Sequence, residues 1–470
     1  MQKILCASGI LFLFCIVLFI KDAEAIPVFA RKYKTTCATC HAPFPKLSAF
    51  GEAFRLNGEK IPGGADEIYV KQEPLSLGAE AYKQIFPNSI WPSSLSEAPP
   101  VSFNVIGDVL VDPTGTHTNS TAFNFQTEID IHSAGTFGDH LSYWGEVIFA
   151  PSPNGPSGSV NSETGTVTTD GAWLMYQDIL PCWFGTNHFN LKAGDLGHLE
   201  ISLPNIRWDN TYQATPYLYQ SQLNLGTEPG FEINGFGRSW KYAVGITKSD
   251  FGNSERDYHA QLDFKIGGLG FDGSGGQTEE GGLKTSPAGY WRDDSIMFGG
   301  FWYRSYDTLT NPDATTSVNA FDRLGGDIRW NCENFSLAGG FTRGLRNDFI
   351  LPSMFSSSFG DLLPPNTLTP AEMALFPTLL INENIWTAEA QYFVYPWLVP
   401  YARFELVNAT NAPNLNQDRV ILGVTALVVA NVRLNFEGVY YFQNQPLNVP
   451  GVIPADVQSN LVDVRLQFAF

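Results

Sequence analysis

The residues with the clearest chemical meaning in this chain are Cys37-Ala38-Thr39-Cys40-His41, a C-x-x-C-H sequence near the N-terminus. Two thiols three positions apart on one turn can form thioethers with the two vinyl groups of a haem, and the adjacent imidazole can then bind the iron. A redox dithiol and half of a zinc site are the competing interpretations. A dithiol needs a surrounding βαβ unit and a structural zinc needs a second ligand pair, and neither follows in the sequence. We therefore predict one covalent haem c per chain, on Cys37 and Cys40, with His41 as an axial ligand.

An amphipathic helix is predicted directly after this motif. Leu47, Phe50 and Phe54 recur at i, i+3 and i+7, and Gly58 marks the stop. The apolar stripe can cover a haem face or pack against any neighbouring surface, and the pattern fits both. A domain of about 50 residues has too small a core to fold alone, so the haem should supply much of its interior. We assign residues 26–75 to a monohaem cytochrome c-like domain.

The first 25 residues have the layout of a secretory signal peptide. A basic residue at Lys3 precedes an apolar stretch, which ends shortly before the small-residue site Ala23-Glu24-Ala25. Cleavage after Ala25 is the prediction, and an uncleaved anchor helix is the alternative. The chain is therefore expected to be exported.

The composition indicates a large β-structure. Charged residues make up 16% of the 470 residues, aromatic residues reach 14%, and there are 44 glycines. Beyond residue 25 we find no apolar run of the length, about 18 residues, that a membrane-spanning helix requires. The remaining classes are a soluble β-sandwich and a β-barrel in lipid. The net charge of -19 argues against nucleic-acid binding, because no basic cluster could neutralise phosphates.

After a Pro- and Ser-rich linker over residues 76–100, the chain repeats segments of about ten residues with period-2 alternation. From Tyr258 to Ile266, polar residues at the odd positions oppose apolar residues at the even positions. Such uniform strands over residues 101–470 favour a barrel in lipid over a soluble sandwich. The predicted fold class is all-β, a 16-stranded antiparallel outer-membrane barrel preceded by a small α-helical c-type cytochrome segment. The strands are expected near 101–112, 121–133, 141–151, 170–180, 186–196, 230–237, 241–249, 256–267, 294–304, 318–331, 334–344, 384–394, 399–408, 418–428, 431–442 and 460–470.

With both chain ends in the periplasm, this order puts the long connections outside the cell. The Gly-rich stretch 267–293 does not fit, and it is either a long periplasmic turn or it hides further strands. Cys182 and Cys332 are placed in separate periplasmic turns, where we favour unpaired thiols over a disulfide.

A sixth iron ligand is missing from the predicted haem domain, because residues 26–74 contain no methionine and no histidine besides His41. By strand parity, His132 and His188 face the lumen near its periplasmic end and Met175 faces it near mid-strand. These three are the weak candidates for a distal haem ligand, although a polar lumen wall or a packing contact explains each of them as well. Luminal charges that could hold a docked haem domain are Glu128, Asp130, Asp263, Lys265, Arg433 and Glu437.

The haem segment also resembles a known family. The residues that carry the resemblance are Phe29-Ala30-Arg31-Lys32-Tyr33, the C-x-x-C-H motif, Phe44-Pro45-Lys46-Leu47 and Phe50 to Gly58. This pattern is similar to the fused outer-membrane cytochrome–porins of iron-oxidising bacteria and their relatives. The resemblance implies haem c on Cys37 and Cys40, His41 as axial ligand, and electron transfer across the outer membrane. It further implies an extracellular redox partner such as Fe(II) and a periplasmic electron carrier.

Two other functions stay open at this stage. One is a diffusion porin whose haem segment is only a structural plug, and the other is a haem enzyme with an open coordination site. We find no hydrolase or transferase motif and assign no catalytic residue. The expected location is the outer membrane of a Gram-negative cell, in contact with its lipid.

Overall fold

In the computed structural model, the described residues are 28–42, 46–62, 69–70, 101–111, 124–137, 139–150, 166–197, 227–249, 255–275, 277–278, 284–285, 291–310, 316–348, 380–410, 416–429, 431–442 and 460–469. The predicted signal peptide with its cleavage site and the predicted linker 76–100 lie outside these ranges. No helix in the described part of the chain is both long and apolar enough to cross a membrane.

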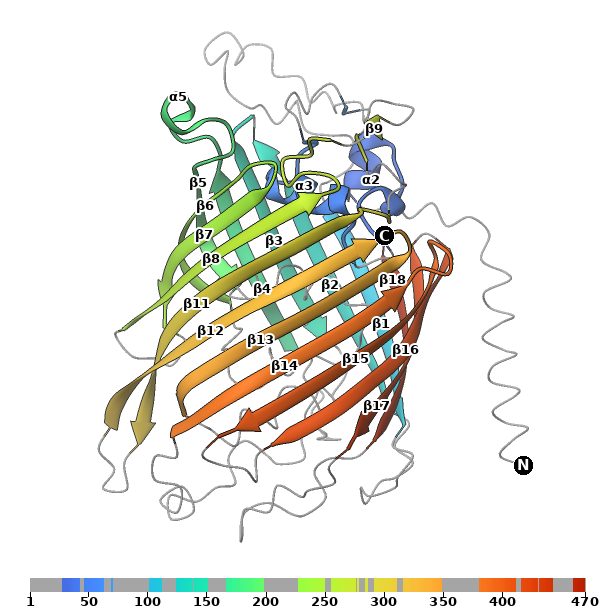
Figure 1. Ribbon diagram of the computed structural model, residues 1–470. Coiled ribbons are helices and arrows are strands. Elements are labelled where there is room, and N and C mark those ends of the chain that lie inside the picture. Colours follow the sequence, from blue (N-terminus) through green and yellow to red (C-terminus); the bar gives the residue numbers. More distant parts are fainter. Residues whose placement is uncertain are drawn as a thin grey trace, which may run out of the picture.

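Sixteen antiparallel strands close into one barrel, and β1 pairs with β18 to complete the ring (Figure 1). The predicted fold class and strand number are confirmed. The barrel strands are β1 (Val101–Val111), β2 (Asn124–Phe137), β3 (Leu141–Ala150), β4 (Thr166–Tyr176), β5 (Asn190–Gly197), β6 (Thr227–Phe236), β7 (Trp240–Lys248), β8 (Arg256–Gly267), β11 (Ser295–Thr310), β12 (Thr316–Cys332), β13 (Phe335–Asp348), β14 (Leu380–Tyr392), β15 (Leu398–Ala409), β16 (Gln417–Val429), β17 (Val432–Tyr441) and β18 (Leu461–Ala469).

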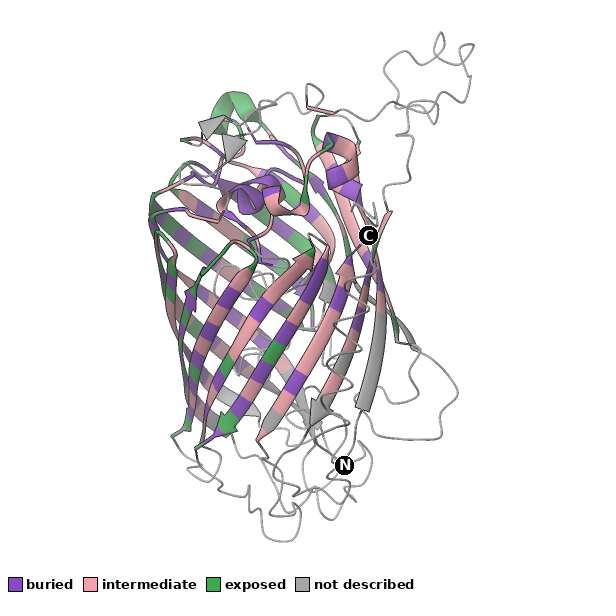
Figure 2. Cartoon of the chain, turned by 90° about the vertical axis from the view of Figure 1, so that its right-hand side faces the viewer, coloured by how far each residue is buried: buried purple, intermediate pink, exposed green. Residues whose placement is uncertain are grey.

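The barrel is apolar outside and polar inside, which is the reverse of a soluble sandwich. In β8, Leu262 and Ile266 are 48% and 65% exposed, whereas His259 and Asp263 of the same strand are 2% and 1% exposed. Successive side chains of a strand point to opposite faces, so the alternation in the sequence becomes an alternation of outer and inner surface. Buried and exposed positions alternate along the strands in Figure 2. This arrangement suits a barrel whose outer wall contacts lipid.

Aromatic side chains gather at the end of the barrel where the short connections lie. Phe137 stacks on Tyr143, Tyr395 stacks on Trp397, and Phe335 lies against Tyr392. Such girdles mark the level at which a barrel wall passes from hydrocarbon to water.

The Gly-rich stretch between β8 and β11 is a long connection with two short strands of its own. β9 (Gln277–Thr278) and β10 (Lys284–Thr285) pair with each other in a separate two-stranded sheet and not with the barrel. Both alternatives for 267–293 were therefore partly right, and the barrel count is unaffected.

The strand prediction was wrong in several details near the short connections. The strand predicted over 170–180 ends at Tyr176. The strand predicted from residue 186 begins at Asn190, because a four-residue helix α5 (Pro181–Phe184) and a turn precede it. Cys182 is exposed in α5, and Cys332 is the last residue of β12. Both thiols are unbonded, as expected.

The helices of the N-terminal segment, by which we mean the described residues between 28 and 70, lie at the short-connection end of the barrel (Figure 1). They are α2 (Val28–Tyr33), the 3₁₀ turn η1 (Cys37–Thr39) and α3 (Ala49–Leu56). The predicted amphipathic helix is α3. Leu47 precedes it and pairs with His41 in an isolated bridge, and Gly58 ends it at a φ of 70°.

Candidate functional site

The C-x-x-C-H residues form one closed turn. η1 contains Cys37, and the backbone N–H groups of Cys40 and His41 donate to its carbonyl oxygen at 3.2 and 3.0 Å. The two thiols and the imidazole are thereby fixed to a single turn of backbone. This is the local geometry that the motif predicts.

Helix α3 holds this turn through its first residues. The Ser48 N–H donates to the Cys40 carbonyl at 2.8 Å, and the Ser48 hydroxyl donates to the Thr39 carbonyl at 3.2 Å. The same hydroxyl accepts from the Gly51 N–H at 3.1 Å and so caps the helix. A Cβ at position 51 would overlap the Cys40 carbonyl oxygen, so only glycine allows this close approach.

The apolar stripe of α3 packs into a small core that includes the barrel. Phe50, Ala53 and Phe54 are buried together with Tyr33 of α2 and with Leu269 from the connection between β8 and β11. Cys40 packs against this cluster. The stripe thus has protein neighbours, as one of the two predicted alternatives required.

The chemistry of the two thiols fits covalent attachment better than a redox dithiol. Neither forms a disulfide. Burial raises the pKa of Cys37, and burial together with the nearby charge of Glu59 raises the pKa of Cys40 to about 12. A reactive redox dithiol needs a lowered thiol pKa. Two unbonded thiols and an adjacent imidazole on one turn are the donor set that attaches haem c, so the residues present fit that group.

A buried ion pair joins α3 to the barrel wall. Lys241 Nζ of β7 donates to Glu52 Oε1 at 2.7 Å, and the two side chains are 10% and 8% exposed. Burial alone would raise the pKa of Glu52, but attraction to Lys241 and then to Arg55 outweighs it and lowers this pKa to about 2. Glu52 is therefore charged in the docked segment, and its charge depends on the wall.

A second polar contact lies further round the ring of strands. Lys46 Nζ donates to Gln391 Oε1 of β14 at 2.7 Å, and both side chains are buried. Burial, reinforced by the positive charge of Arg329 and opposed by Glu389, lowers the pKa of Lys46 to about 7. A cationic residue of the segment is thus held against the wall with much of its hydration removed.

Further contacts distribute the N-terminal segment around the mouth of the barrel. Arg31 Nη2 donates to the Val101 carbonyl at 2.5 Å, at the first residue of β1. Lys60 Nζ donates to the carbonyl of Asp139, between β2 and β3. Ala42 packs with Phe393 and Val399 at the β14–β15 connection. All of these barrel residues lie at or near the strand ends with short connections. The N-terminal segment is therefore a plug in that mouth. The sequence analysis expected this segment inside the lumen, and the structure places it at one end of the lumen.

The predicted luminal charges mostly pair with other wall residues. Lys265 Nζ is 2.7 Å from Asp293, Arg433 donates to Gln467 at 3.2 Å, and Glu437 accepts from Tyr401 at 2.8 Å. Asp263 is buried next to Gln261, which donates to it. The side chain of Glu128 lies outside the described part. The sequence prediction missed Lys241 and Gln391, the wall residues whose side chains bind Glu52 and Lys46. Lys241 is paired with Asp263 across β7 and β8 and so faces the lumen as Asp263 does.

The three distal-ligand candidates have different surroundings. Met175 is buried on the luminal wall, and its sulfur accepts from Asn234 at 3.9 Å. It is paired across the sheet with Ser142, which is close to Gly58 of the segment. His188 lies in the turn before β5 with its ring against Trp240, so its predicted place in a strand was wrong. His132 lies on β2 beside Glu146 of β3.

Solved structures share the barrel architecture. OmpF of Salmonella typhi, in complex with daunomycin, aligns with a TM-score of 0.50 and 9% identity, over 79% of this chain and 97% of that chain. OmpT of Vibrio cholerae, as a loop-deletion mutant, aligns at 0.45 and 13% identity over 79% and 98%. The outer-membrane channel DcaP of Acinetobacter baumannii aligns at 0.42 and 10% over 79% and 96%. The likeness to OmpF shows a porin-type barrel fold and nothing further.

No family model matches the sequence, and no curated protein matches it either.

Proposed function

We propose that this protein is an outer-membrane barrel of porin type whose periplasmic mouth is closed by a plug that carries one covalent haem c. The apolar outer wall, the aromatic girdle and the porin-type fold support the location. The contacts of Arg31, Lys46 and Glu52 with three different strands support the plug. Cleavage of the signal peptide after Ala25 belongs to the same proposal.

In this proposal Cys37 and Cys40 would hold the haem through thioethers, and His41 would bind its iron. When bound, the haem supplies a one-electron redox couple. Ser48 and Gly51 fix the turn that bears these residues on α3, and the aromatic cluster around Phe54 keeps water from one side of it. Glu52 and Lys241 hold α3 to the wall. The chain thus orients the attachment turn relative to the barrel before any partner arrives.

The function that combines these features is electron transfer between an extracellular redox partner, such as Fe(II), and a periplasmic electron carrier. The single observation that carries it is a C-x-x-C-H turn docked by buried contacts in the barrel mouth. The apolar band of such a barrel is about 25 Å tall, and a segment at one mouth does not span it. We therefore propose that the extracellular partner is a small donor that reaches the plug through the lumen.

A diffusion porin with a haem-bearing plug is the second candidate function. The porin-type barrel favours it directly, whereas electron transfer requires in addition that the haem exchanges electrons with partners on both sides of the membrane. The two functions differ in what passes through the lumen. Solute flux into liposomes tests the porin, since a plug that stays docked should keep the flux low.

Haem staining after denaturing electrophoresis tests the shared premise. The full chain should stain, and Cys37→Ala combined with Cys40→Ala should abolish the stain. Cys182→Ala is the matched control, because this cysteine is exposed in α5 and should have no effect on staining. Zinc in place of iron in the purified protein would contradict the proposal.

A further inference from the structure

We propose that Asp130, His132 and Glu146 form a binding site for a first-row divalent metal cation on the luminal wall. Asp130 and His132 are two residues apart on β2 and so share the luminal face. Glu146 is paired with His132 across to β3. This site is separate from the C-x-x-C-H turn, and nothing in its argument depends on haem.

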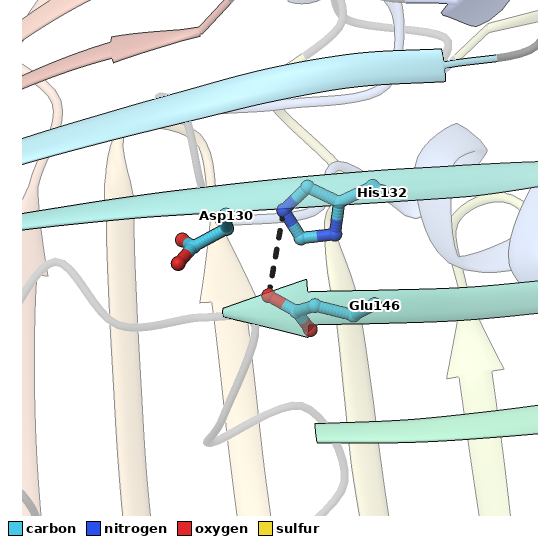
Figure 3. A group of neighbouring side chains, drawn as sticks. All are labelled: Asp130, His132 and Glu146. Carbon is cyan, nitrogen blue, oxygen red and sulfur yellow. Dashed lines mark ion pairs between the residues drawn. The ribbon is translucent and has the colours of Figure 1, made fainter. Parts of the chain in front are cut away.

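The three side chains are close enough to share one ion. One ligand atom from each lies within 4.8 Å of the other two, and Figure 3 shows the three side chains side by side. His132 Nε2 and Glu146 Oε1 are 3.5 Å apart. Two ligands of one first-row ion are separated by about 3 to 3.5 Å, so this pair is already near the ligating distance. Asp130 offers an oxygen within the same 4.8 Å, and side-chain torsions can bring it closer to a shared ion.

The state of Asp130 is the independent observation that points to a ligand. Asp130 is 4% exposed, and its Oδ2 accepts a hydrogen bond from the Asn104 side-chain amide at 2.8 Å. Its Oδ1 is buried without a hydrogen-bond partner among the described residues. A buried carboxylate oxygen that lacks a partner costs free energy, which a cation would recover. The hydrogen bond from Asn104 also fixes the carboxylate as an outer-shell group does in metal sites.

The ligand set selects the class of ion. One imidazole nitrogen and two carboxylates form a mixed nitrogen and oxygen set, which suits Mn(II), Fe(II), Co(II) or Zn(II). Ca²⁺ and Mg²⁺ prefer sites made of oxygen alone. Two carboxylates also balance the double positive charge of the ion at a site where Asp130 and Glu146 are both buried.

The register of β1 and β2 places this site close to the plug. Arg31 of the N-terminal segment contacts Val101, which lies opposite Ser133, and Asn104 lies opposite Asp130. Three residues of strand separate these two levels, which is about 10 Å. A cation bound here would therefore lie inside the barrel, just beyond the point where the plug meets β1.

Binding of Mn(II) to the purified full-length protein in detergent tests the site, because bound Mn(II) loses the free ion's six-line electron paramagnetic resonance signal. We expect one Mn(II) per chain, displaced by Zn(II), which binds such ligands more tightly. Asp130→Asn and Glu146→Gln should each weaken binding at least tenfold. Glu232→Gln is the matched control, because Glu232 pairs with His259 at 3.1 Å elsewhere on the wall. Equal binding by Asp130→Asn and wild type, or an equal loss in Glu232→Gln, would overturn the proposal.

A second measurement has its main readout in the unaltered chain, so this readout does not depend on the folding of a variant. Electron spin echo modulation of the bound Mn(II) should show coupling to one imidazole nitrogen. His132→Gln should remove this coupling. Bound Mn(II) without nitrogen coupling in the wild-type protein would mean that the ion sits on carboxylates elsewhere, and the proposed site would be wrong.

Discussion

Loss of the Lys241 charge should release the plug from the barrel mouth. Lys241→Met keeps the length and apolar stem of the side chain but leaves the Glu52 carboxylate buried without its closest cation. Glu52 has a pKa of about 2 in place of 4.5, which corresponds to about 3 kcal/mol of stabilisation of the charged carboxylate, and part of this comes from Arg55 on the same helix. Both side chains are about nine-tenths buried, so solvent screening reduces this value little.

Lys241 contributes the largest attraction to Glu52, and Arg55 and Lys265 contribute the rest. We therefore expect Lys241→Met to weaken docking by about 2 kcal/mol, which is a factor of about 30 in the docking equilibrium. In planar lipid bilayers, this factor should appear as more frequent openings of the barrel to its full conductance. Combining Lys241→Met with Glu52→Gln should restore most of the closure, since the buried carboxylate that Lys241→Met leaves without its closest cation is then replaced by a neutral amide.

Lys192→Met is the matched control for this experiment. Lys192 is also a buried luminal lysine, on β5, and its ammonium lies over the ring of Trp173 on β4. An opening frequency in Lys241→Met that equals those of wild type and Lys192→Met would refute the role of the ion pair in docking.

Three further predictions concern the pH dependence of docking, the plug as a whole and the distal haem ligand. The pKa of Glu52 is lower in the docked segment than in the released one, so ionised Glu52 stabilises docking fully above about pH 4.5, and this stabilisation is lost as the pH falls towards 2. Channel openings should therefore become more frequent as the pH falls over this range, and an opening frequency independent of pH would contradict this prediction. Deletion of residues 26–86 should give a barrel with permanently high conductance, and a closed deletion variant would show that something other than the plug blocks the lumen. Simultaneous replacement of His132, His188 and Met175 by Ala should alter the visible spectrum of the reduced protein if any of them is the distal ligand; an unchanged spectrum would place the ligand elsewhere or leave the position open.

The barrel could be predicted from the sequence because its determinant is local. The period-2 pattern from Tyr258 to Ile266 requires only that neighbouring side chains point to opposite faces, and the structure places these residues as expected. The strand start near His188 could not be located in this way. Residues before Asn190 form α5 and a turn, and a few alternating residues there look like a strand.

The attachment turn could likewise be predicted from adjacent residues, whereas its docking could not. Glu52 and Lys241 are 189 residues apart, and Lys46 and Gln391 are 345 apart. No local pattern indicates which luminal side chain meets the plug, because the choice depends on how a folded segment fits a closed barrel. The same holds for Glu146, which reaches His132 only through the pairing of β2 with β3.

Electron transfer into sealed proteoliposomes tests the central claim most directly. External Fe(II) is the donor, and a cytochrome c enclosed with calcein is the acceptor, so that calcein quenching reports any entry of iron. We expect the enclosed cytochrome to be reduced faster than iron enters, and we expect this reduction to be lost in Cys37→Ala combined with Cys40→Ala. An enclosed cytochrome that stays oxidised, or one that is reduced equally fast with the cysteine variant, would contradict electron transfer by the haem-bearing plug.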